Sequence, residues 1–166
     1  ILPDFSIEAN ITLVSLARYC RGGIFDRSAA EEAARNYVAR FRIKPRDISA
    51  PLRALSGGNQ QKAIAARELD RQHDLLIAVQ PTRGLDVGAI ETIHKKMIES
   101  RDSGSAVLLV SLELDEVMNV SDRILVMYEG EIVGEFDPKK ITVQELGLYM
   151  SGAKRQTAAK EEKGDE

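Results

Sequence analysis

Two short segments of the chain carry residue types that bind phosphate. LSGGNQQK covers residues 55–62, and QPTRGLD covers residues 80–86 at the end of a hydrophobic strand. In the first segment two glycines let the backbone approach a ligand, and Ser56 supplies a hydroxyl. The helix that follows directs its N–H groups and positive dipole end at the same point, as phosphate-binding helices do. The simpler alternative is a Ser-Gly-Gly turn that only caps a helix.

The loop that cradles nucleotide phosphates in many proteins, G-x-x-x-x-G-K-[ST], occurs nowhere in the sequence. The chain therefore has a segment that can reach across to phosphates and lacks the segment that holds them. We expect a partner segment to supply the missing loop. Because the first residue is Ile, we also expect the chain to be cut from a longer protein.

The composition indicates an ordinary globular domain. The chain has 166 residues, of which 43% are hydrophobic and 30% charged, enough for a sizeable core. A net charge of -3 and a pI near 5.6 argue against nucleic acid as a partner. The single cysteine, Cys20, excludes an intrachain disulfide, and no zinc-ligand spacing is present. The apolar runs are much shorter than the roughly 20 residues of a membrane helix.

The hydrophobic period changes along the chain. Residues 1–72 have helical spacing and predict an all-helical subdomain, whereas residues 73–150 alternate strand and helix and predict a parallel sheet with helical crossovers. Residues 151–166 lack large apolar side chains, so we expect a disordered tail. The expected helices are a run from Ser6 to about Leu16, then 29–41, 59–71, 87–103, 114–120 and 143–150. The expected strands are 74–79, 106–111, 123–128 and 131–136, the last two joined by a turn at Glu129-Gly130.

Four motifs together resemble one known family, the ATP-binding subunits of ABC transporters. The motifs are LSGGNQQK at 55–62, PTRGLDVGA at 81–89, SLELDEV at 111–117, and SDRI at 121–124 leading into VMYEGEIVGE. The resemblance covers nearly the whole chain and is strongest to importers of simple sugars and, in a related branch, nucleosides. It implies the second, C-terminal nucleotide-binding domain of a two-domain subunit. The implied fold is α/β: a helical subdomain (1–72) followed by a partial RecA-like, P-loop NTPase parallel sheet (73–150) that lacks the Walker A strand.

The sequence departs from the family pattern at three positions. Val79-Gln80 stands where the family has Asp-Glu, and Leu112 stands where it has a histidine. By the resemblance, the aspartate would hold magnesium through water, the glutamate would polarise the attacking water, and the histidine would contact the γ-phosphate. Valine cannot hold magnesium through water, and leucine cannot make the polar contact of the histidine. Glutamine does not take up a proton at neutral pH. We expect no hydrolysis by this chain alone, no catalytic residue and no metal ligand of its own.

The resemblance also implies how the intact segments act. Two nucleotide-binding domains pack head to tail, and each ATP lies between the Walker loop of one and the signature segment of the other. Ser56, Gly57, Gly58 and Gln60 would complete a site whose ATP and Mg²⁺ are held mainly by the partner domain. Asp86 would cross the same interface and couple the two sites. The chain's own site, formed with Val79, Gln80 and Leu112, would be degenerate.

The implied partners are an N-terminal nucleotide-binding domain, fused or separate, membrane permease subunits and, indirectly, a solute-binding protein. The implied location is peripheral, on the cytoplasmic face of the cell membrane. Two other functions stay open: a non-transport ABC ATPase and a regulatory nucleotide-sensing module. The choice between sugar and nucleoside also stays open, because the ATP-binding subunit does not select the substrate.

The absent Walker A strand leads to a structural expectation. In the family this strand lies between the strands at Ala106 and Arg123. Without it we expect either direct pairing of these two strands or an open gap with apolar residues such as Leu109 and Val126 exposed.

Overall fold

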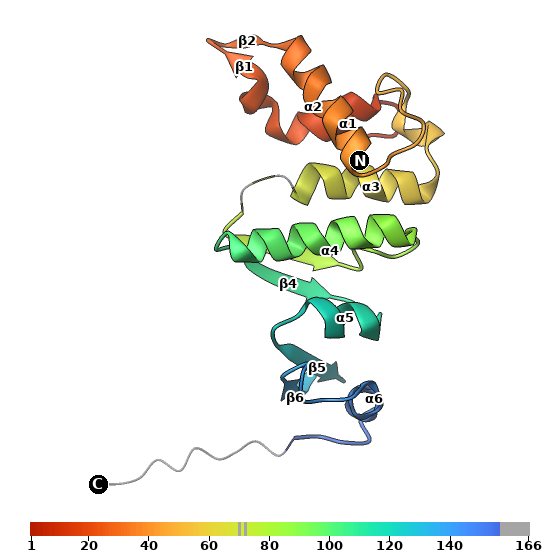
Figure 1. Cartoon of the computed structure of the whole chain (residues 1–166), viewed down its shortest axis with the longest axis vertical. Helices are drawn as coiled ribbons and strands as arrows, with labels where there is room; N and C mark the ends of the chain where they lie inside the picture. Colours follow the sequence, from red (N-terminus) through yellow and green to blue (C-terminus); the bar gives the residue numbers. More distant parts are fainter. Residues whose placement is uncertain (70, 72, 157–166) are drawn as a thin grey trace, which may run out of the picture. The chain divides into compact units, whose positions relative to one another are not determined.

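The computed structural model describes residues 1–69, 71 and 73–156 (Figure 1). The chain divides into two compact units, Ile1–Val110 and Ser111–Glu166, and each is described by itself. The sequence predicts a different division, into residues 1–72, 73–150 and 151–166, and this division stays a prediction. None of the described helices is both long and apolar enough to cross a membrane.

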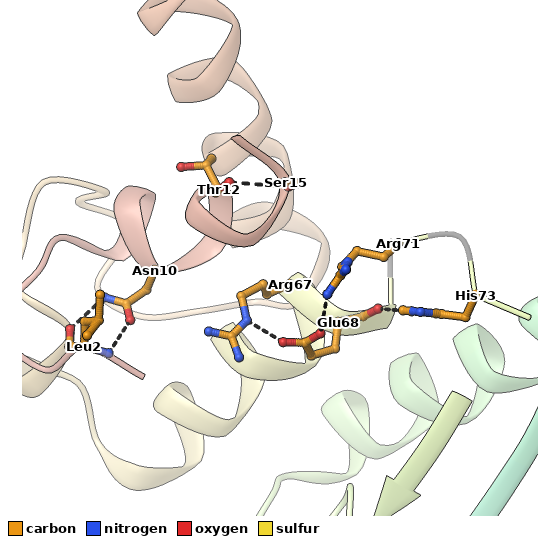
Figure 2. A network of polar contacts seen from close by, with 8 residues as sticks. All are labelled: Leu2, Asn10, Thr12, Ser15, Arg67, Glu68, Arg71 and His73. Atoms are coloured by element: carbon orange, nitrogen blue, oxygen red, sulfur yellow. Dashed lines mark hydrogen bonds and ion pairs between the residues drawn. The ribbon is translucent and has the colours of Figure 1, made fainter. Parts of the chain in front are cut away.

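The first helix of the first unit is shorter than its sequence pattern predicts. Helix α1 (Ile7–Thr12) begins as expected, with the Ser6 hydroxyl accepting a hydrogen bond from the Ala9 N–H at 3.0 Å. The chain then tightens into the 3-10 segment η1 (Leu13–Tyr19), which is interrupted at Ser15. The Thr12 hydroxyl donates to the Glu8 carbonyl. The Ser15 hydroxyl donates to the Thr12 carbonyl (Figure 2). Such side-chain bonds compete with the regular helix ladder, which explains the break.

A short hairpin follows where only a helix separator was expected. Strands β1 (Cys20–Arg21) and β2 (Ile24–Phe25) pair antiparallel around Gly22 and Gly23. Both glycines have positive φ, 58° and 82°, which a tight hairpin turn requires and other residues rarely adopt. The prediction that the front part is all-helical is therefore wrong at this hairpin.

Helices α1, α2 (Arg27–Arg40) and α3 (Gly57–Leu69) form the helical core of the first unit. Small side chains on the contacting faces let the helix backbones approach closely, because alanine adds little bulk. A 3-10 turn, η2 (Leu52–Ala54), leads into α3, which starts two residues earlier than predicted. The buried residues of this core include Ile7, Ile11, Ala30, Ala34, Val38, Phe41, Leu52, Ala63 and Ala66.

Two polar clusters fix the ends of this core (Figure 2). The buried amide of Asn10 accepts from the Leu2 N–H and donates to the Leu2 carbonyl, both at 2.8 Å, which ties the N-terminal segment to α1. At the C-terminal end of α3, the Glu68 carboxylate accepts from Arg67 at 2.6 Å and from Arg71 at 3.3 Å. The Glu68 carbonyl lies 2.6 Å from His73 Nε2, which connects the last turn of α3 to a residue just before the next strand.

The last part of the first unit is a β-α-β element. Strands β3 (Leu75–Val79) and β4 (Ala106–Val110) pair in parallel, with Val79 opposite Val110, and α4 (Val87–Asp102) connects them. Helix α4 buries Ala89, Ile93 and Met97, which are spaced four residues apart on one face. The alternate residues of both strands point to a second, exposed and apolar face. The large members of this face are Leu75, Ile77, Val79, Leu108 and Val110.

The second unit is a hairpin covered by helices. It contains α5 (Leu114–Val120), β5 (Ile124–Tyr128), β6 (Glu131–Phe136) and α6 (Val143–Met150). The predicted turn at Glu129-Gly130 is present: both residues have positive φ, 48° and 83°, and Tyr128 pairs with Glu131 across it. A small core of Ile124, Val126, Val133 and Leu146 lies between the hairpin and α6.

The segment 151–156 is ordered along β6, which differs from the expectation of a tail that is disordered from residue 151. The Gln156 N–H donates to the Val133 carbonyl at 2.8 Å, and its side-chain amide bonds both the N–H and the carbonyl of Glu135. Arg155 pairs with Glu131 at 2.6 Å and lies over the Tyr128 ring. The rest of the expected tail, 157–166, lies outside the described residues.

Within the described residues the strands form three separate two-stranded sheets, so β4 and β5 do not pair directly. The expectation about individual side chains is wrong for Val126, which is only 5% exposed because α6 covers it, while Leu109 is half-buried. The exposed apolar residues of β3 and β4 lie instead at the alternate positions.

Candidate functional site

The LSGG segment forms the start of helix α3. Leu55 is buried and anchors the turn, whereas Ser56 and Gly57 are exposed and Gly58 is half-buried. The Leu55 N–H donates to the Leu52 carbonyl at 3.0 Å, which closes the turn of η2 just before the helix. The glycines therefore lie in the first helical turn, where backbone N–H groups have no partner within the helix.

Side-chain amides organise this helix start. Asn59 Nδ2 donates to the Ser56 hydroxyl at 3.0 Å, and Asn59 Oδ1 accepts from the Lys44 N–H at 2.9 Å. The Gln60 amide turns back and donates to the Leu55 carbonyl at 3.0 Å. Asn59 thus joins the signature turn to the loop after α2. The sequence pattern did not single out Asn59, although this residue lies inside the LSGGNQQK string.

The loop Thr82–Asp86 packs directly on this helix start. A Cβ added to Gly58 would lie 3.2 Å from the Gly84 carbonyl oxygen and 3.9 Å from Leu85 Cδ2. Gly84 has φ 73° and the Leu85 N–H donates to the Thr82 carbonyl at 3.1 Å, so the loop is a tight turn. Glycine at position 58 is therefore explained by close approach of the two backbones.

Asp86 links three parts of the first unit. One carboxylate oxygen accepts from the Lys62 ammonium of α3 at 2.5 Å, and the other accepts from the Ala89 N–H at 3.0 Å as the N-cap of α4. The hydrogen bond from Lys62, together with that from Ala89, lowers the pKa of the Asp86 carboxyl below its ordinary value of 3.8. Asp86 is therefore fully ionised at neutral pH.

A second cation lies close to the start of α4. A Cβ added to Gly88 would lie 2.6 Å from Arg42 Nη1, so a larger residue there would make this guanidinium shift. Arg42 itself has a positive φ of 52° at the end of α2. The loop after α2 thus contacts the same helix start that Asp86 caps.

The degenerate positions lie elsewhere. Val79 is exposed at the end of β3, and Gln80 follows with a φ of 49°, its N–H donating to the Val110 carbonyl at 2.8 Å. Leu112 belongs to the second unit and is 74% exposed. The structure therefore brings Gly58 and Asp86 together within the first unit.

These residues do not fit a magnesium ion. Val79 and Gln80 contribute no carboxylate, and no group of three or more His, Cys, Asp or Glu side chains suited to a metal occurs among residues 1–69, 71 and 73–156. The exposed start of α3, by contrast, fits an anionic group, because it combines a helix N-terminus, a hydroxyl and two glycines.

The sequence is similar to ATP-binding proteins of bacterial importers. It is 52% identical over 95% of its length to the guanosine import ATP-binding protein NupO of Bacillus subtilis and 53% identical over 90% to the nucleoside import ATP-binding protein NupA of Lactococcus lactis. It is 38% identical over 96% to the ribose import ATP-binding protein RbsA 2 of Rubrobacter xylanophilus. The chain spans 31%, 30% and 31% of the lengths of these relatives. No protein-family model matches it.

Solved structures agree on the fold. One ATP-binding subunit of an ABC transporter aligns with a TM-score of 0.74 at 19% identity, over 91% of this chain and 64% of that one. The ATP-binding cassette MJ0796, in a dimeric post-hydrolysis state with ADP and Pi, aligns with a TM-score of 0.71 at 23% identity, over 85% of this chain and 60% of that one. The predicted α/β, RecA-like fold class is confirmed. The chain belongs to the ATP-binding proteins of ABC transporters.

Proposed function

We propose that this chain is the signature-bearing part of the ATP-binding subunit of an ABC importer. In this proposal Ser56, Gly57 and Gly58 contact the phosphates of an ATP whose other side is held by a partner nucleotide-binding domain. The observation that carries it is the start of α3, where the exposed Ser56 hydroxyl directly precedes a helix whose first two residues are glycines. Gln60 supports the turn from within, since its amide bonds the Leu55 carbonyl.

The chemistry proposed for this chain is binding and orientation. The helix dipole and the first-turn N–H groups stabilise negative charge on the phosphates, and these groups are fixed before ATP arrives, so little reorganisation is needed. Bound ATP supplies the phosphoryl group, with Mg²⁺ held by the partner domain. Asp86 would lie at the same interface and couple the two nucleotide sites. The chain's own site, with Val79 and Gln80, offers no group that takes up a proton at neutral pH.

We further propose nucleosides as the transported class. The relatives that match at 52% and 53% over 95% and 90% of the chain are named for guanosine and nucleoside import, whereas the ribose protein matches at 38%. The partners would be the permease subunits and, through them, a solute-binding protein, with the subunit at the cytoplasmic face of the membrane. Co-purification of the subunit with a permease would separate this role from a non-transport ATPase or a nucleotide sensor.

The decisive experiment places a cation with a long side chain in the proposed phosphate contact. Ser56→Arg in the complete ATP-binding subunit should lower ATPase turnover by at least about 100-fold, since the preorganised phosphate contacts are lost. Ser28→Arg is the matched control, because Ser28 is also an exposed serine at the start of a helix. Unchanged turnover in Ser56→Arg, at equal protein stability, would reject the proposed role.

A comparison variant addresses the degenerate end. Val79→Asp with Gln80→Glu restores the family's carboxylates at the end of β3. We expect turnover of the complete subunit to change by less than about 3-fold, because the competent site takes its carboxylates from the partner. A large gain in turnover would mean that this chain's own site limits hydrolysis.

A further inference from the structure

The contact between Lys62 and Asp86 joins two elements that lie 24 residues apart in sequence. Lys62 is the last residue of LSGGNQQK and lies one helical turn after Gly58. Its ammonium is 2.5 Å from the Asp86 carboxylate, which stands at the end of the loop Thr82–Asp86. The sequence pattern alone assigns Lys62 no role.

The burial of the two partners is unequal. The Lys62 side chain is 8% exposed, whereas the Asp86 side chain is 62% exposed. A buried ammonium without a partner is costly, so the lysine needs this carboxylate. Because the lysine stem is packed among helices, its ammonium has a fixed position. The exposed aspartate is therefore held by a rigid partner, unlike an aspartate in an ordinary surface ion pair.

A second contact lies on the same face of α3. Residues 58 and 62 are four apart, so they lie above one another on the helix surface. Gly58 approaches the Gly84 carbonyl oxygen, and Lys62 bonds Asp86. The loop is thus attached to the helix at two points, which restrict both its distance from α3 and its rotation about the first contact.

We propose that Lys62 is a positioning residue that fixes the loop Thr82–Asp86 on the signature helix, so that Ser56 and Asp86 are presented to the partner domain at a constant spacing. The proposal rests on the proposed function for its consequence in catalysis. Lys62 acts through Asp86 and does not itself contact ATP. Without Lys62, the loop would keep its Gly58 contact and lose its second attachment.

The test measures loop order and turnover in the complete ATP-binding subunit. Lys62→Met removes the charge and keeps an unbranched apolar stem. We expect faster hydrogen exchange at the Leu85 and Ala89 amides, and kcat for ATP lowered about 10-fold, because a misplaced group costs turnover. The KM for ATP should change less than about 3-fold, since the phosphate contacts at Ser56 remain. Lys62→Arg should restore most of both, because it keeps the charge.

Lys96→Met is the matched control. Lys96 also bonds a carboxylate at 2.5 Å, with its side chain 20% exposed, but its partner Glu99 lies in the same helix. The bond between Lys96 and Glu99 connects no two elements. Without it, hydrogen exchange in the loop Thr82–Asp86 and kcat should therefore stay at the wild-type values. In addition, Lys62→Met combined with Asp86→Asn should lower kcat no further than the more affected of the two single variants, since both break one link.

Two outcomes would overturn the proposal. If Lys62→Met leaves the exchange of Leu85 and Ala89 unchanged, Lys62 does not hold the loop. If Ser56→Arg abolishes turnover while Lys62→Met leaves kcat unchanged, the signature role stands and the positioning role is wrong. Should Ser56→Arg itself leave turnover unchanged, the proposed function fails, and the exchange measurement still decides whether Lys62 orders the loop.

Discussion

Helices α3 and α6 begin with the same spacing of polar residues and differ in what these residues do. At α6 the Thr142 hydroxyl accepts from the Glu145 N–H at 3.2 Å, and the Glu145 carboxylate accepts from the Thr142 N–H at 3.1 Å, a closed capping box. At α3 the Ser56 hydroxyl accepts instead from the side-chain amide of Asn59, which also accepts from a distant backbone N–H. A helix start closed by its own side chains stabilises the fold, whereas the first turn of α3, which lacks this box, is the phosphate contact that we propose.

The largest expected effect on stability tests whether close backbone contact between Gly58 and Gly84 holds the start of α3. Gly58→Leu should reduce the free energy of unfolding by about 1–3 kcal/mol, because the new side chain overpacks against the Gly84 carbonyl. Gly57→Leu is the control, since an added Cβ there meets nothing within 4 Å. Urea denaturation followed by circular dichroism measures both. Equal losses in the two variants would contradict the close-contact explanation.

The next largest expected effect is the loss of unfolding free energy on deleting a helix cap, which should differ between α6 and α3. Thr142→Ala removes the hydroxyl that caps α6 and should cost about 1 kcal/mol of unfolding free energy. Ser56→Ala should cost much less, because Ser56 bonds a side chain and not the third helical N–H. The same denaturation experiment compares them. If Ser56→Ala proved as costly as Thr142→Ala, the serine would be a structural cap.

A third variant converts the start of α3 into the type seen at α6. Asn59→Glu creates the S-x-x-E spacing of a capping box and should raise the unfolding free energy by about 0.3–1 kcal/mol. It should also lower ATPase turnover in the complete subunit, since a carboxylate would lie at the proposed phosphate contact. Asn59→Gln, which keeps the amide, is the control for the loss of charge neutrality. Higher turnover in Asn59→Glu than in Asn59→Gln would contradict the comparison.

The smallest expected effect is a difference in acid sensitivity. Hydrogen bonds from the Thr142 N–H and hydroxyl lower the pKa of Glu145 below its ordinary value of 4.5. The unfolded chain therefore binds the proton more readily, so this stabilisation is present above pH 4.5 and is lost as the pH falls toward the lowered pKa. Glu145→Gln should remove that part of the pH dependence, as measured by denaturation midpoints at stepwise lower pH. An identical acid profile in this variant would mean that the carboxylate contributes nothing to the cap.

Local signals in the sequence predicted much of the fold. The first helix begins after Ser6 as expected, and the Glu129-Gly130 turn sets the last hairpin, because each depends on residues that are near neighbours. The end of α1 at Thr12 and the interruption of η1 at Ser15 were not predicted, since the apolar spacing continues through them and the competing hydroxyl bonds do not show in a pattern. The hairpin at Gly22-Gly23 was also missed, because two-residue strands leave no period to detect.

The candidate site was predicted as a set of motifs and not as a packed arrangement. The LSGG string identified Ser56, Gly57 and Gly58 because glycine and serine have specific backbone and hydroxyl roles. Lys62 could not be selected, since a lysine in a helix rich in Gln, Arg and Ala is typical of a solvated face. Its burial depends on how α3 packs with α4, and its partner follows 24 residues later. Only tertiary structure shows that contact.

The position of Gln156 has a practical consequence for engineering the chain. Its backbone and its side-chain amide together occupy three polar backbone groups of β6, at Val133 and Glu135. Exposed strand edges of this kind recruit strands from other molecules, and a bonded edge does not. A purification tag or fusion joined before residue 156 would remove this cover and favour self-association, whereas one joined after it would leave the hairpin protected.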